Sequence, residues 1–153
     1  MTLRIREATL DDVPQIAALA GVLGYTVDAD EMSSRLRQVL DLPDEVVLAS
    51  ELDSDELCGW THAVIHTLLT APLTCELQAL VVSPHHRRHG AGRALVAAVE
   101  AWSLQRGVTT MIVRSNIVRT ESHAFYPGLG YARTKTQHVY SKLLAARREP
   151  PLS

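Results

Sequence analysis

The chain has 153 residues, of which 46% are hydrophobic and 21% are charged. This length and composition suit one compact domain with a substantial core, so we expect no second folded domain. The formal net charge is −2 at neutral pH, and basic residues gather at residues 87–93 instead of covering a whole face. We therefore expect no general nucleic-acid partner.

The cysteines and the apolar runs indicate the cellular location of the protein. Cys58 and Cys75 fall on predicted strands without the spacing of metal ligands, so we interpret them as reduced thiols. The sequence has no apolar run of the length that spans a bilayer, and its first residues lead into a strand instead of a signal peptide. We expect a cytoplasmic protein with no membrane partner.

The N-terminal part predicts a strand and two helices. Residues 3–8 resemble a strand, and Thr9 with Asp12 resembles a helix N-cap with its acidic partner. Apolar residues then recur at helical spacing and predict a first helix that ends near Gly24. Residues 28–40 predict the second helix, with its apolar residues on one side.

The middle of the chain predicts three strands, a helix and a fourth strand. Two strand-like runs, residues 45–52 and 57–66, flank a polar turn and predict a hairpin. Residues 76–82 form the third strand of this series. After the loop that follows, a helical pattern extends to Gly107, a residue typical of a helix C-terminus. Residues 112–116 predict the next strand.

The C-terminal part predicts a last helix followed by a final strand. Residues 134–144 alternate loosely and predict that strand, whereas residues 145–153 contain two prolines and resemble a frayed tail. The alternation of strands and helices indicates an α/β class with a mixed sheet. We therefore predict a single domain over residues 3–144.

The most informative segment is the loop within residues 81–95. An apolar run turns at Pro84 and passes through Gly90 and Gly92 into an alanine-rich helix. A helix that begins there leaves N–H groups unpaired at its N-terminus, where the helix dipole also favours an anion. Charge-assisted donors are supplied by Arg87, Arg88, His89 and Arg93. The segment predicts a site for a pyrophosphate or a phosphorylated nucleotide.

Other phosphate-binding and metal-binding motifs fit this loop less well. It lacks the Lys and Ser or Thr of a P-loop and the three-glycine spacing of a dinucleotide fingerprint. His85, His86 and His89 lack a companion cysteine or paired carboxylates, so we expect no metal. A helix that starts at a glycine-rich turn beside a solvated basic run stays open as a purely structural alternative.

These residues resemble the signature of the GNAT superfamily of N-acetyltransferases. In that signature, Arg or Gln is followed by two residues, Gly, one residue, and Gly or Ala, and Arg87, Gly90 and Gly92 fill those places. Residues 123–131, HAFYPGLGY, resemble the family's closing motif, and the order of predicted elements also agrees. The resemblance implies the GNAT fold, a mixed central β-sheet flanked by about four helices, with acetyl-CoA as co-substrate.

The resemblance also implies how acetyl-CoA is held. In the family, amides of the loop hold the pyrophosphate, and backbone groups of the preceding strand contact the acetyl end. Carried over to this chain, the cofactor-binding residues are Leu80, Val81, Val82, Arg87, Arg88, His89, Gly90, Ala91, Gly92, Arg93, Asn116, His123 and Phe125. Arg88 stands where many relatives have glycine, so it either adds a phosphate contact or tightens the loop.

Acetyl transfer to an amine needs a base and an acid. An alkylammonium has a pKa near 10.4, so only about one molecule in a thousand carries the free lone pair at neutral pH. In some GNAT enzymes the base is a glutamate placed as Glu76 is here; a water or histidine relay is the alternative. The family's acid falls on Tyr126, which can protonate the leaving thiolate.

The acceptor is less well defined by the sequence. We expect Tyr25 and His62 to border its pocket. The resemblance favours the small-molecule branches of the family, so we predict direct transfer to a primary amine of a small molecule. The alternatives are a non-catalytic acyl-CoA binding module and a peptide or protein N-acetyltransferase. Many relatives pair through their late strands, so a homodimer is compatible with the resemblance.

Overall fold

The computed structural model describes two units of the chain. The residues described are 2–53, 55–86, 89–114 and 120–146, without the side chains of 120–123. The two units are Met1–Asn116 and Ile117–Ser153, and each is described here by itself. The single domain over residues 3–144 stays a prediction.

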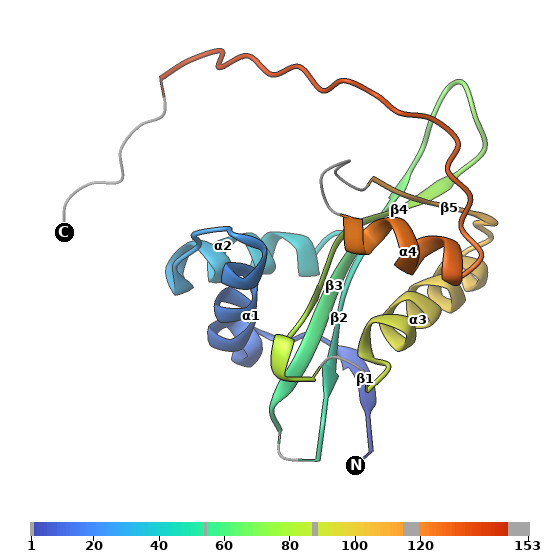
Figure 1. The fold of residues 1–153 in the computed structure, drawn as a ribbon. Helices are drawn as coiled ribbons and strands as arrows, with labels where there is room; N and C mark the ends of the chain where they lie inside the picture. Colours follow the sequence, from blue (N-terminus) through green and yellow to red (C-terminus); the bar gives the residue numbers. More distant parts are fainter. Residues whose placement is uncertain (1, 54, 87–88, 115–119, 147–153) are drawn as a thin grey trace. The chain divides into compact units, whose positions relative to one another are not determined.

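The first unit is a five-stranded sheet with helices on both faces (Figure 1). Its elements are β1 (Arg4–Glu7), η1 (Leu10–Asp12), α1 (Val13–Ala20), η2 (Gly21–Leu23), α2 (Ala29–Leu40), β2 (Glu45–Glu51), β3 (Leu57–His66), β4 (Thr74–Val82), η3 (Pro84–His86), α3 (Ala91–Gln105) and β5 (Thr110–Val113). The second unit contains α4 (Thr120–Gly128). The predicted α/β class with a mixed sheet and about four helices is confirmed.

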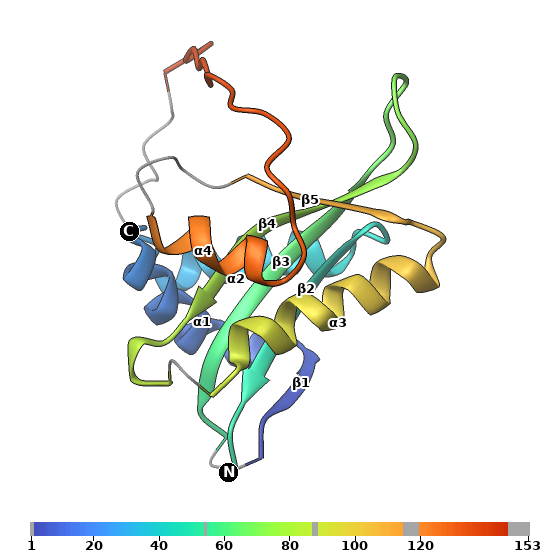
Figure 2. The same ribbon diagram turned by 45° about the vertical axis from the view of Figure 1, so that its right-hand side comes forward.

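The strands lie in sequence order, β1-β2-β3-β4-β5. Neighbouring strands are antiparallel except for β4 and β5, which are parallel because α3 crosses between them. Helices α1 and α2 lie on one face of the sheet and α3 lies on the other (Figure 2). The sheet is therefore covered on both faces by elements of its own unit.

The predicted first helix forms over residues 10–23 as one unbroken helical stretch, in which α1 has a 3-10 turn at each end, η1 and η2. The N–H of Thr9 donates to the carboxylate of Asp12 at 2.8 Å, which supports the predicted acidic partner. Pro14 then stands in the first turn of α1, where its missing N–H costs no helical hydrogen bond. Gly24, at φ 89°, ends η2 in the left-handed region. Asp28 caps α2 by accepting from the N–H of Glu31 at 2.7 Å.

The core is built on both faces of the sheet. Under α1 and α2 the buried residues include Ile16, Leu36 and Val47, with Val81 of β4 in the same cluster. On the α3 side, the buried side chains of the helix are Leu95, Val96 and Val99. Each such side chain contributes about 1.5–3 kcal/mol of burial free energy, so the two layers fix the central strands firmly.

The predicted final strand at residues 134–144 is wrong. Residues 131–146, all of them described, adopt neither helix nor strand. Within residues 134–144 the apolar residues come as two adjacent pairs, Val139 with Tyr140 and Leu143 with Leu144. Adjacent residues point to opposite faces of a strand, so this pattern gives no single apolar face to bury.

Gly59 allows the close approach of β3, β4 and α3. An ideal Cβ at this position would lie 2.6 Å from the carbonyl oxygen of Val81 and 3.3 Å from Cδ1 of Leu95. The first of these atoms belongs to the backbone of β4, so it cannot move away without disturbing the sheet. Only glycine fits here without displacement.

We expect Gly59→Ala to lower the free energy of unfolding by about 1–3 kcal/mol, because the new methyl group overpacks a closed contact. Urea denaturation of both proteins measures this difference. Gly21→Ala is the control, since Gly21 has φ −59° and open space around its Cβ position. The control should be neutral or slightly stabilising; equal stability of Gly59→Ala and the wild type would contradict the packing argument.

Arg6 ties three elements together. Its Nη1 and Nη2 donate to the two carboxylate oxygens of Asp12, each at 2.8 Å, and its Nε donates to Glu51 at 3.1 Å. Both acids are buried. The bidentate Arg6 contact, helped by the N–H of Thr9, holds the pKa of Asp12 below its usual range although burial opposes this.

The stability of the protein should therefore fall with acid in a way that depends on Asp12. A depressed folded-state pKa gives stabilisation above the unfolded value of about 3.9, and this is lost as pH falls through the folded value. Asp12→Asn should cost about 2–4 kcal/mol at pH 7, since it leaves Arg6 without its bidentate partner.

Thermal melts from pH 7 to pH 3 measure this effect, and the gap between Asp12→Asn and the wild type should narrow as pH falls. Asp11→Asn is the matched control, because Asp11 is adjacent in sequence and exposed. A gap that stays constant with pH would contradict the role of the ionised carboxylate.

Candidate functional site

The sheet opens between β4 and β5. Residues 74–77 of β4 pair with residues 110–113 of β5, and this pairing stops there. Toward β3, β4 stays paired up to Val82, with one irregularity: Ala63 faces Leu77 while His62 faces Ala79, so Gln78 is an extra residue. This bulge bends the strand where it parts from β5. Within the described residues, β4 beyond Leu77 has a strand on one edge only.

The open edge of β4 presents backbone groups. The N–H of Ser83 donates to the carbonyl of Cys58 at 2.8 Å, so it points toward β3. Because successive residues of a strand direct their amides to opposite edges, those of Val82 and Leu80 point to the open edge. The side chain of Val81 is buried in the core. The predicted cofactor-binding stretch 80–82 therefore lies along an edge with unpaired N–H donors.

Helix α3 begins directly after the loop that leaves this edge. Gly90, at φ 79°, is its N-cap, in a conformation that favours glycine. The first helical hydrogen bond runs from Ala94 N–H to the Gly90 carbonyl at 2.9 Å. The amides of Ala91, Gly92 and Arg93 precede that bond and have no acceptor inside the helix.

The surroundings of this helix start suit an anion. Its first turn contains no acidic residue, and Arg93 and His89 are exposed beside it. Unpaired amides and the positive end of the helix dipole act in the same direction. The predicted contacts Arg87 and Arg88 lie outside the described residues, as does Asn116.

Glu76 is buried near the point where β4 and β5 part, and its carboxylate has two polar partners. Its Oε1 lies 3.0 Å from Nε2 of His66 and also accepts a salt bridge from Nη1 of Arg114. Glu76 faces Ile112 across the parallel pair, and Arg114, two residues further, shares that face. The alternation of residues 112 and 114 could have revealed Arg114, but sequence reasoning missed this partner.

His62 forms a second histidine–carboxylate pair on the same face. Its Nε2 lies 2.8 Å from Oε1 of Glu45, another residue that sequence reasoning missed. Glu45 and Glu76 both face Val64 of β3, from opposite sides, so the two pairs are neighbours. Tyr25 lies in the connection between η2 and α2 with 60% of its surface exposed. Its role at the acceptor pocket stays a prediction.

The second unit holds the predicted acid. Tyr126 lies in α4, its ring centroid 5.0 Å from that of Phe125 and 6.0 Å from that of Tyr131, both edge to face. Burial raises the pKa of the Tyr126 phenol above its ordinary value of 10.0. The phenol therefore keeps its proton at neutral pH, as a proton donor requires. The side chain of His123 lies outside the described residues.

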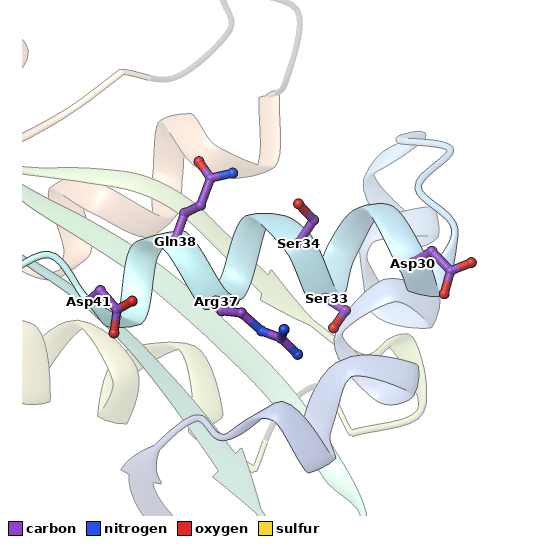
Figure 3. A pocket seen from close by; sticks show the side chains of 6 residues that line it. All are labelled: Asp30, Ser33, Ser34, Arg37, Gln38 and Asp41. Carbon is purple, nitrogen blue, oxygen red and sulfur yellow. The ribbon is translucent and has the colours of Figure 1, made fainter. Parts of the chain in front are cut away.

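A shallow groove of about 500 Å³ runs along α2 (Figure 3). The described residues that line it are Asp30, Ser33, Ser34, Arg37, Gln38 and Asp41. Five of them lie on one polar face of α2 and Asp41 is its C-cap; none of the six is among the predicted site residues. The candidate site is instead the point where β4 and β5 part, where a buried acid lies near backbone donors that no described strand pairs.

The described residues contain neither a membrane-spanning helix nor a candidate metal site. None of their helices combines the length and apolar character needed to cross a membrane. Their His, Cys, Asp and Glu side chains form no group of three that could hold a metal ion. Cys58 and Cys75 are free and buried.

Comparison with known proteins shows the family of this chain. The model of the acetyltransferase (GNAT) family matches residues 14–131. An aminoglycoside N(6')-acetyltransferase type 1 of Stenotrophomonas maltophilia is 31% identical over 137 residues, which cover 86% of this chain and 87% of that protein.

Solved structures show the same fold. The aminoglycoside 6'-N-acetyltransferase AAC(6')-Ih of Acinetobacter baumannii superposes with a TM-score of 0.82 at 21% identity, over 94% of this chain and 100% of that chain. AAC(6')-Iy, crystallised with a bisubstrate analogue containing CoA, gives a TM-score of 0.82 at 20% identity, over 94% and 99%. At these identities the similarity shows a shared fold and nothing further.

The family match thus spans most of the chain, and it includes β4, the open start of α3 and the motif around Tyr126. A relative above 30% identity is similarly long. The chain therefore belongs to the GNAT family of acetyltransferases.

Proposed function

We propose that this protein transfers the acetyl group of acetyl-CoA directly to a primary amine of a small molecule. The observation that carries the proposal is the adjacency of the open β4 edge and the open start of α3. One offers N–H donors to an acyl group, and the other offers amides to a pyrophosphate. An acyl-CoA thioester carries both groups in one molecule.

The cofactor would be held mainly by backbone. The amides of Ala91, Gly92 and Arg93 would bind the pyrophosphate, with the basic side chains of residues 87–89 adding charge. The amides of Leu80 and Val82 would bind the pantetheine and acetyl carbonyls. A rigid backbone N–H stabilises the oxyanion of the tetrahedral intermediate without reorganising during the reaction.

The transfer needs one group that accepts a proton from the amine and one that donates a proton to the sulfur. The amine nitrogen attacks the thioester carbon, the C–S bond breaks, and the amide product and a CoA thiolate form. Glu76, or a water or His66 relay beside it, takes the proton of the amine. Tyr126 supplies the proton that the sulfur needs, a role assigned from its place in the family motif. Asn116, His123 and Phe125 are proposed to line the cofactor.

The small-molecule acceptor is supported by the relatives, several of which are named aminoglycoside acetyltransferases. We place the reaction in the cytoplasm, which suits the two free thiols. A homodimer is proposed from the family resemblance, and sedimentation of the purified protein would test it.

The function is tested by titrating acetyl-CoA into the purified protein and by measuring thiol release with a panel of amines. Binding with turnover on small amines supports the proposal. Binding without turnover on any amine or peptide would instead indicate an acyl-CoA binding module. Turnover on peptides alone would indicate a protein N-acetyltransferase, and no binding of acetyl-CoA would overturn all three.

We expect Gly90→Asp to weaken acetyl-CoA binding about tenfold or more, because it puts negative charge and bulk where the pyrophosphate meets the helix dipole. Calorimetric titration measures this. Gly107→Asp is the matched control, since Gly107 follows the end of the same helix at φ 78° with open space, compared with φ 79° and open space at Gly90. Equal weakening in both variants would show a folding effect and contradict the anion site.

We expect Tyr126→Phe to lower kcat by about a hundredfold while the Kd for acetyl-CoA is kept, because the hydroxyl acts only as the sulfur leaves. Its raised pKa also predicts that loss of activity through phenol ionisation begins at a higher pH than an unperturbed phenol would give. Stopped assays from pH 7 to 10 measure both. Tyr140→Phe, at an exposed position, is the control. Unchanged kcat would remove Tyr126 from the acid role.

A further inference from the structure

A compact charged cluster lies where β4 and β5 part. Glu76 is in the last part of β4 that still pairs with β5, and Arg114 is the first residue beyond the end of β5. Both lie on the face of the sheet that carries His62 and His66 of β3. If the thioester lies in the opening, this cluster is adjacent to the reacting carbon.

The acids of this cluster are already paired. Glu45 accepts from His62, and Glu76 is shared by His66 and Arg114. Both carboxylates are mostly buried, with 19% and 11% of their side chains exposed. A polycationic acceptor would therefore have to displace existing partners to find a counter-charge here, and it would meet a guanidinium while doing so.

Unlike the two mostly buried carboxylates, the guanidinium of Arg114 is accessible to a further hydrogen-bond partner. Its side chain is 57% exposed, and among the described residues Glu76 is its salt-bridge partner, with Nη1 as the contacting nitrogen. A guanidinium has five N–H donors in a planar fork that fits a carboxylate with two parallel hydrogen bonds. One accessible edge of Arg114 is thus able to bind an acid.

We propose that Arg114 binds an acidic group of the acceptor, so that the preferred substrates are small amines that also carry a carboxylate. The inference rests on the proposed acetyl transfer and names its acceptor class. The carboxylate of the acceptor binds the exposed part of the guanidinium, which stays paired with Glu76. Glu76, held beside it, receives the proton of the acceptor's amine. Arg114 acts as a specificity-determining residue.

The arrangement also limits the size of the acceptor. Glu76 and Arg114 are in direct contact, so the groups they bind must be close together in the substrate. A short amino acid, with few bonds between its nitrogen and its carboxylate, meets this condition. An extended polyamine offers no group for Arg114 and repels it.

The test compares acceptors in pairs that differ only in carboxylate or carboxamide, built on α-, β- and γ-amino acids, with spermidine as a polycation. Thiol release from acetyl-CoA gives kcat/KM for each acceptor. The proteins are the wild type, Arg114→Gln, Arg114→Lys and Arg4→Gln. The last is the matched control, because Arg4 is an exposed arginine that pairs with the buried Glu51 at 3.4 Å.

We expect the wild type to favour the carboxylate, and the acid-to-amide ratio to fall about tenfold or more in Arg114→Gln, as loss of a charge-assisted contact implies. The change should lie in KM. Arg114→Lys should keep part of the preference, and Arg4→Gln all of it. Amidation changes the basicity of the amine equally for every variant, so this cancels when ratios are compared.

The outcomes separate the inference from the proposed function. Turnover with an acid-to-amide ratio that Arg114→Gln leaves unchanged overturns the role of Arg114 and leaves acetyl transfer intact. The same holds if spermidine is the best acceptor of the wild type. Binding of acetyl-CoA without thiol release from any amine overturns the proposed function, and this inference with it. Circular dichroism melts of the Arg114 variants separate loss of folding from loss of recognition.

Discussion

The parting of β4 and β5 is the constraint on which the rest of the site depends. In a strand in the middle of a sheet, the N–H groups donate hydrogen bonds to the neighbouring strands. An N–H group that is bonded in this way cannot bind a ligand. Here the parallel pairing ends at Leu77, which frees the edge that contains Leu80 and Val82. The same strand leads through a short loop to Gly90, so in the proposed function one stretch of the chain would provide donors to two parts of acetyl-CoA.

The sequence predicted what is local along the chain. Gly90 and Gly92 predicted the helix start that the structure has at Gly90, since a turn and a helix start depend on neighbouring residues. The partners of Glu76 were not predicted, because His66 and Arg114 reach it across strands whose register depends on the whole sheet. The final strand was predicted wrongly because a loose alternation at residues 134–144 was taken for a buried face.

Stability and chemistry are separated in the first unit. The network centred on Arg6 joins β1, η1 and β2, on the opposite edge of the sheet from β5. Gly59 sets the packing of the central strands against α3. A replacement of Arg114 should therefore leave the contacts centred on Arg6 and Gly59 in place.

The extra residue at Gln78 has a consequence for how this segment can evolve. Before the bulge the even-numbered residue Glu76 shares the face of His62 and Val64, whereas after it the odd-numbered Ala79 and Val81 do. Removing one residue would put the acid on the opposite face from its histidine partner, or else turn the β4 donors away from the opening. Gln78 itself is exposed, so its side chain is free to change. The position should accept many substitutions and no deletion, a constraint of chain length that no count of side-chain contacts would reveal.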